Sequence, residues 1–104
     1  MPNPWVVQWE TVDEDGRPER WTFHYKRMVR RDSITLSEWS QEKLNNARNV
    51  DIFPELQPMI IRKIERNGAP FDDYDELPVD VLEQSIELYP SFQRNREDGD
   101  GASQ

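Results

Sequence analysis

The side chain with the widest chemical repertoire is His24, the single histidine among 104 residues. A histidine acts as a general base or a metal ligand only with suitable partners, such as a serine and a carboxylate, or further His and Cys ligands. The chain has no cysteine, which excludes disulfides, thiolate nucleophiles and cysteine-based zinc sites. No serine–histidine–acid arrangement is indicated around His24. We therefore predict no catalytic residue and expect His24 on the polar face of a strand.

Two acidic runs contain the carboxylate oxygens that hard cations prefer. The run at 72–76 has four acidic residues but lacks the spacing and the bend glycine of a calcium loop, and the run at 98–101 is not followed by a bidentate glutamate. Both are expected to be solvated charge, so we predict no metal site. Carboxylate spacing alone does not exclude glycoside chemistry, but so small a domain has little room for a sugar cleft.

The glycine and charge content argues against two further classes of function. The chain has four glycines and neither a GxGxxG nor a GxxxxGK[ST] pattern, so we expect no nucleotide and no other cofactor. The net charge of −8 disfavours binding to nucleic acid or to anionic membranes. A basic cluster at Lys26, Arg27, Arg30 and Arg31 stands against this background. It is either solvated or faces an acidic partner, a phosphate or a second copy of the chain.

The length and composition predict one small domain over residues 1–93 and a disordered polar tail over residues 94–104. Mean hydropathy is −0.99, and 11% of the residues are aromatic, so large rings must provide much of the core. No apolar run approaches the roughly 20 residues that span a membrane, and the start of the chain lacks the features of a signal peptide. We expect a cytoplasmic protein.

The N-terminal part has the period-two alternation of a β-hairpin. Residues 5–12 and 20–26 alternate apolar and polar side chains, and the polar segment between them has Asp15-Gly16 at its centre. Pairing Trp9 with Trp21 would place six apolar side chains on one face, which helices or another chain must cover. These side chains are Trp5, Val7, Trp9, Trp21, Phe23 and Tyr25.

Three helices are predicted after the hairpin. The first begins at Thr35, which pairs with Glu38 as a capping box, and runs to about residues 45–47. The second covers Pro54–Arg66, where Leu56, Ile60 and Ile64 recur every four residues, and Asn67-Gly68 closes it. The third follows Pro78 and buries a stripe of Val81, Leu82, Ile86 and Tyr89. The predicted fold class is α+β, with the order β-β-α-α-α.

Exposed aromatic rings would favour binding to a partner, because such rings are enriched at binding hot spots. The rings of the hairpin, the basic cluster and the tryptophan of the first helix are therefore the candidate partner-binding residues. They are Trp5, Trp9, Trp21, Phe23, Tyr25, Lys26, Arg27, Arg30, Arg31 and Trp39.

The layout resembles the small tail assembly chaperones of long-tailed bacteriophages. The resemblance rests on the aromatic hairpin Trp5–Lys26, on Ile34–Trp39, and on further amphipathic helices before a polar tail. The segments Asn67–Pro70 and Glu76–Leu82 are similar to actinobacteriophage versions. The resemblance implies a non-enzymatic protein that binds the tape-measure protein during tail assembly, in the cytoplasm of the host, with self-association along that client. A frameshifted longer form is common in the family, and the chain shows no sign of one.

Two other functions fit the same composition. An acidic inhibitor that mimics DNA would bind a basic groove, and its binding would weaken strongly with salt. A structural connector or tail protein would remain in purified virions, whereas a chaperone would be absent from them. A small enzyme is the least favoured alternative.

Overall fold

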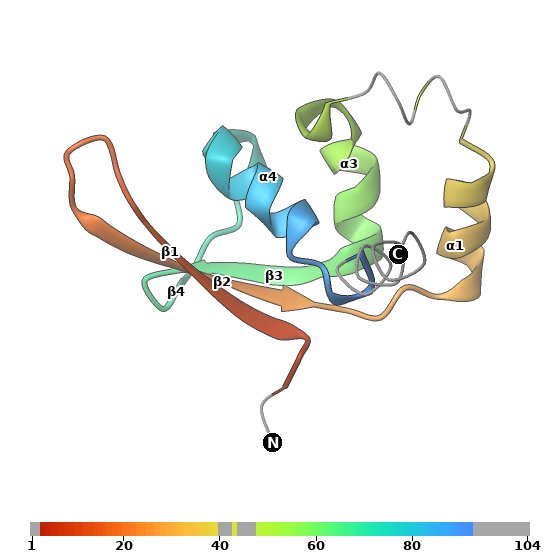
Figure 1. The fold of residues 1–104 in the computed structure, drawn as a ribbon, viewed down its shortest axis with the longest axis horizontal. Helices are drawn as coiled ribbons and strands as arrows, with labels where there is room; N and C mark the ends of the chain where they lie inside the picture. The colour runs from red at the N-terminus through yellow and green to blue at the C-terminus, as the bar shows by residue number, and fades with distance from the viewer. Residues whose placement is uncertain (1–2, 40–42, 44–47, 93–104) are drawn as a thin grey trace, which may run out of the picture.

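The computed structural model describes residues 3–39, 43 and 48–92. Its centre is a four-stranded antiparallel sheet of order β1-β2-β3-β4, formed by Val6–Val12, Pro18–Tyr25, Ile61–Arg66 and Ala69–Pro70. The helices are α1 (Arg30–Ser37), α3 (Asn49–Ile60) and α4 (Val79–Glu87), with a 3₁₀ turn η1 at Tyr74–Glu76. Helices α3 and α4 lie on one face of the sheet, and α1 stands beside them at one end (Figure 1). The α+β class is confirmed.

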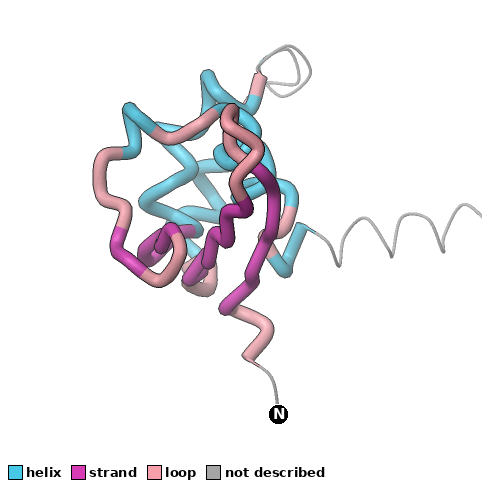
Figure 2. Tube along the Cα trace, turned by 90° about the vertical axis from the view of Figure 1, so that its left-hand side faces the viewer, coloured by secondary structure: helices cyan, strands magenta, loops and turns pink. Residues whose placement is uncertain are grey.

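The predicted hairpin has the predicted register. Trp9 pairs with Trp21, and Val7 pairs with Phe23. The Tyr25 N–H donates to the Trp5 carbonyl at 2.7 Å, which continues the ladder beyond the strand ends. The side view shows the strands as one layer with the helices packed to one side (Figure 2). The aromatic face of the hairpin is therefore covered by helices of the same chain.

The prediction of a helix over Pro54–Arg66 is wrong in both bounds. Helix α3 begins at Asn49 and ends at Ile60, and strand β3 follows with no loop between them. Ile61 and Ile64 are three residues apart, which in a regular strand would place them on opposite faces. The pairing of β2 with β3 is irregular at this point, as a bulge would make it, and both isoleucines are buried. Because of the bulge, the buried isoleucines of this strand are spaced as they would be on one face of a helix.

Asn67-Gly68 is a hairpin turn and not the end of a helix. Both residues have positive φ, at 52° and 86°, and Arg66 pairs with Ala69 across them. These are the features of a two-residue turn that needs left-handed backbone at both central positions. The Asn67 side-chain oxygen also accepts the Arg20 N–H at 2.9 Å, which ties the turn to β2.

The predicted start of the first helix is also wrong. Helix α1 begins at Arg30, with Val29 as its N-cap, so Thr35 lies in the last turn and does not cap it. The Thr35 hydroxyl donates to the Arg31 carbonyl at 3.1 Å, the bond that a threonine makes inside a helix. The predicted continuation to residues 45–47 is wrong at its beginning, because α1 ends at Ser37 with Glu38 as its C-cap. Positions 40–42 and 44–47 lie outside the described residues.

The third predicted helix is confirmed as α4, with Pro78 as its N-cap. Its predicted stripe is buried, and Tyr89 beyond its end is fully buried. This stripe packs with the apolar residues of α3 and the inner face of the sheet in a single core. The buried apolar residues are Trp21, Phe23, Tyr25, Phe53, Leu56, Ile60, Ile61, Ile64, Leu77, Val81, Leu82, Ile86 and Tyr89.

The predicted disordered tail, residues 94–104, lies outside the described residues. Within the described part of the chain, no helix has the length and apolar character needed to cross a bilayer.

Candidate protein-interaction surface

Three of the predicted partner-binding rings belong to the core. Trp21 and Phe23 are fully buried, and Tyr25 is 3% exposed. These rings pack against the helices, so in the folded chain they have no surface to offer to another molecule. The apolar character that suggested a binding site is explained by the internal packing of the sheet.

Two tyrosines fix the backbone where the basic cluster begins. The Tyr89 hydroxyl donates to the Lys26 carbonyl at 2.8 Å, and the Lys26 N–H donates to the Ile60 carbonyl at 2.9 Å. The Tyr25 hydroxyl donates to the Ser85 carbonyl at 2.6 Å. Burial raises the pKa of both tyrosines, so the hydroxyls stay protonated and remain donors. These hydrogen bonds therefore fix the backbone at Lys26, where the chain leaves the core.

Helix α1, which follows this anchor, buries none of its eight residues. Its outward face carries Arg30, Ser33, Ile34 and Ser37, which are all exposed and recur at helical spacing. Its inward face, which includes Leu36, is only partly buried. An isolated helix of this length is not stable in water, so α1 depends on packing that the described residues supply only in part.

Apolar and basic side chains lie together on and beside α1. Val29 is 50% exposed and Ile34 is 40% exposed. The Arg31 side chain is 87% exposed and lies 4.0 Å from the Asp32 carboxylate. Arg27 and Arg30 are exposed and form no ion pair within the described residues. We call Arg27, Val29, Arg30, Arg31 and Ile34 the α1 surface.

The three remaining tryptophans are partly buried at the margins of the core. Trp5 packs on Tyr89, with ring centroids 5.9 Å apart. Trp39 lies just beyond α1, where the Lys43 ammonium sits 4.1 Å from the ring centroid and also binds Glu55 of α3 at 2.7 Å. Trp39 follows the basic cluster in the sequence, whereas Trp9 lies in strand β1.

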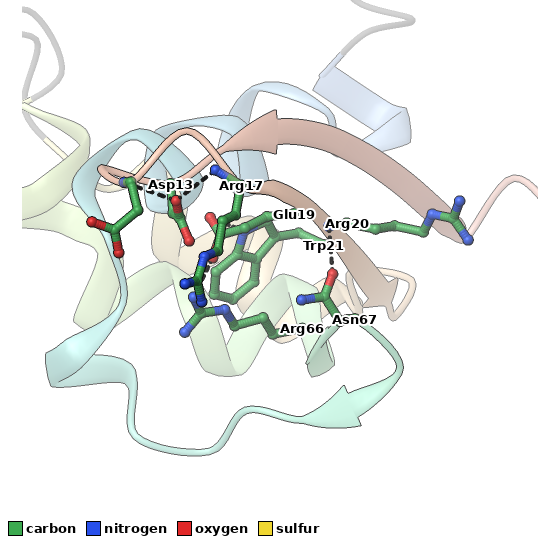
Figure 3. Close-up of polar contacts among 8 residues, drawn as sticks. Asp13, Arg17, Glu19, Arg20, Trp21, Arg66 and Asn67 are labelled. Atoms are coloured by element: carbon green, nitrogen blue, oxygen red, sulfur yellow. Dashed lines mark hydrogen bonds and ion pairs between the residues drawn. The ribbon is translucent and has the colours of Figure 1, made fainter.

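The far end of the hairpin is held by a polar network under Trp21 (Figure 3). Glu19 is 7% exposed, accepts the Trp21 indole N–H at 3.4 Å and binds the Arg66 guanidinium at 2.5 Å. The guanidinium carbon lies 5.7 Å from the centroid of the Trp21 ring. Each polar atom of this buried carboxylate has a partner, so the network is structural and does not await a ligand.

The outer face of the sheet carries no helix in the described structure and is polar (Figure 1). His24 bonds the Glu65 carboxylate across this face, and the hydrogen bond lowers the pKa of Glu65. A second pair joins Arg20 to Glu10 at 3.2 Å. An open groove of about 670 Å³ runs over these residues, but its charges are paired with one another. The prediction that His24 lies on the polar strand face is correct.

Of the two acidic runs, residues 72–76 include the turn η1, and residues 98–101 lie outside the described part. In the ranges that the structure covers, no three acidic or histidine side chains converge as metal ligands would.

Sequence reasoning selected the arginines of the α1 surface but missed its apolar members. Val29 and Ile34 lie among basic residues, and Ile34 follows Arg30 at the i,i+4 spacing of one helix face. Extending the predicted helix back to Arg30 would have placed Ile34 on one face with Arg30, and Val29 directly before that face.

The comparisons with known proteins identify no relative. No protein-family model, no curated protein and no solved structure matches the chain.

Proposed function

We propose that this protein is a non-enzymatic protein-binding protein that holds a helical client through the α1 surface. The observation that carries the proposal is a short helix that buries none of its own residues and presents exposed apolar and basic side chains. Packing against a client would give α1 the stabilising contacts that its own fold supplies only in part.

The charge of the α1 surface specifies the client. Arg27, Arg30 and Arg31 form a cationic patch on a chain with a net charge of −8, so most partners would meet an acidic body except at this patch. A client helix with an apolar stripe flanked by Asp and Glu would place its stripe on Val29 and Ile34 and its carboxylates on the arginines.

The biological role proposed for this binding is tail assembly in a long-tailed bacteriophage, with the tape-measure protein as the helical client. Support for the phage role comes from the resemblance in sequence layout described above, and the tape-measure protein fits as a long helical molecule.

Co-expression with the tape-measure protein encoded in the same genome tests the proposal. The wild-type chain is expected to co-purify with it, and R30E/R31E is expected to retain at most about a tenth of that binding, because two attractive contacts become repulsive. The control is R17E/R20E, which makes the same change in net charge at the far end of the hairpin and should bind like the wild type.

Two results would contradict the proposal. If the wild-type chain does not co-purify with the tape-measure protein, the phage role is wrong. If R30E/R31E binds as well as R17E/R20E, the α1 surface is not the binding site.

A further inference from the structure

Strand β1 is the free edge of the sheet in the described structure, because β2 is its only neighbour. At one end the Trp5 carbonyl accepts a bond from β2, and at the other the Asp13 N–H donates to the Arg17 carbonyl at 2.9 Å. Because the backbone groups of a strand alternate in direction, the odd-numbered residues face β2. The even-numbered residues from Val6 to Val12 direct their N–H and C=O groups away from the sheet.

This edge lacks the features that usually prevent pairing with another strand. The seven residues of β1 contain neither proline, lysine nor arginine, and Glu10 is their one charge. The exposed side chains at its two ends are apolar, with Val6 at 38% and Val12 at 59% exposure. A strand edge without such features favours pairing with a further strand.

We infer that two copies of the chain associate through antiparallel pairing of β1 with β1, centred on Trp9, which would join their sheets into one continuous sheet. This inference uses a different surface from the proposed client site and does not depend on it.

The register follows from the chemistry of the edge. Centring the two-fold axis on Trp9 pairs Val6 with Val12 of the second copy, Gln8 with Glu10, and the two partly buried Trp9 rings with each other. This register pairs all seven residues of β1, and it sets an amide, not a carboxylate, opposite each Glu10. Moving the two-fold axis by one residue, from Trp9 to Glu10, would place the Glu10 carboxylates of the two copies face to face, which is unfavourable.

The backbone groups of the edge suit this register. Gln8 and Glu10 form a hydrogen-bonded pair in it, and Val6 offers its carbonyl to Val12. The Val6 N–H already donates to the Asn3 carbonyl at 3.2 Å, so that pair has one bond in place of two. The interface therefore has about six backbone hydrogen bonds in total.

A charge-swap pair of variants tests the register with the full-length protein. In V6K/V12K, two lysines face each other at both ends of the paired strands, whereas in V6E/V12K each lysine faces a glutamate. Both substitutions are at exposed positions, so both variants should fold, which circular dichroism would verify. Sedimentation equilibrium at about pH 8, where the introduced lysines and glutamates are charged, should show a wild-type dimer. V6K/V12K is expected to raise its dissociation constant about tenfold or more, and V6E/V12K is expected to restore association.

Amide hydrogen exchange provides a second measurement. The Gln8 and Glu10 N–H groups should exchange more slowly as protein concentration rises, while the exposed Arg30 N–H in the first turn of α1 should not change. A wild-type chain that stays monomeric at about millimolar concentration would overturn the inference. Equal dimerisation of the two double variants would do the same, because it would place the dimer interface elsewhere.

Discussion

Replacing Tyr25 with phenylalanine should destabilise the fold by removing one hydroxyl from the end of α4. The Ser85 carbonyl lies in the last turn of that helix, and the N–H that would normally reach it, from Tyr89, bonds the Ile86 carbonyl at 3.2 Å instead. The Tyr25 hydroxyl takes its place at 2.6 Å, in a site where Tyr25 is 3% exposed. It therefore satisfies one of the carbonyls that a helix C-terminus leaves without a partner.

The expected loss follows from leaving that carbonyl buried without a donor. Such a group costs about 1–3 kcal/mol of unfolding free energy, and each kcal/mol lowers Tm by roughly 4–8 °C in a domain of this size. Urea unfolding followed by circular dichroism would measure the loss, and an unchanged denaturant slope would show that only stability changed.

The matched control is Y74F. The Tyr74 hydroxyl makes no hydrogen bond within the described residues, while its ring contacts Phe53 as a tyrosine or a phenylalanine would. Y74F should therefore change the unfolding free energy by less than about 0.5 kcal/mol. If Y25F and Y74F lose the same small amount, the hydroxyl does not cap α4 and the reasoning is refuted.

Three further changes test other parts of the fold. R66M should lower the unfolding free energy by about 1.5–3 kcal/mol, because it removes the charged partner of the buried Glu19. R20M changes an exposed ion pair and should lower the unfolding free energy by less than about 1 kcal/mol in the same urea titration. G68A should cost about 1–2 kcal/mol, since Gly68 has φ of 86° with open space around it, so the loss is backbone strain; G68N should cost less, and equal losses would contradict the turn assignment. E65Q tests pH dependence: the folded pKa of Glu65 lies below its ordinary 4.5, so the unfolded chain takes up a proton at higher pH than the folded chain. The stability advantage of the wild type over E65Q should therefore be present above about pH 4.5 and fall away below it; an advantage that grows in acid would show the opposite sign.

The hairpin and α4 could be predicted because each depends on local sequence. Alternation in two strands around Asp15-Gly16 set the pairing of Trp9 with Trp21, and Pro78 placed the start of α4. In both elements the buried face has the period of its own secondary structure, so pattern and packing agree.

Strand β3 was missed because its pattern and its packing disagree. Ile60, Ile61 and Ile64 continue the spacing of α3 across its end, and only the irregular pairing with β2 places Ile61 and Ile64 on one face. That pairing joins residues far apart in sequence, so no local window contains it. The available signal was Asn67-Gly68, which is as typical of a two-residue hairpin as of a helix end.

The start of α1 was missed for a different reason. Thr35 and Glu38 satisfy a capping box by residue type, but the same threonine also fits inside a helix, where its hydroxyl bonds the Arg31 carbonyl. A capping box stabilises a start only if the preceding residues leave the helix, and nothing between Arg30 and Thr35 breaks one.

The covered aromatic face changes where evidence for a partner must be sought. Since α3 and α4 cover Trp21, Phe23 and Tyr25, those rings no longer require a second molecule. The argument for a binding partner therefore depends on the apolar side chains that remain exposed.

Single exposed apolar residues are common and need no explanation. Here, however, the large exposed ones occur in pairs, on α1 and its N-cap and at the two ends of β1, with one other at the start of α4. They are Val29 and Ile34, Val6 and Val12, and Val79. One pair lies beside Arg27 and Arg30, which form no ion pair within the described residues, and the other lies on an edge strand of the described sheet. The two surfaces therefore favour different partners, a helix with acidic flanks and a second copy of β1. Charge reversal at α1 should therefore leave dimerisation unchanged, and V6K/V12K should leave client binding unchanged at the level of a single chain. A variant at either surface that impaired both functions would show that the two sites are one.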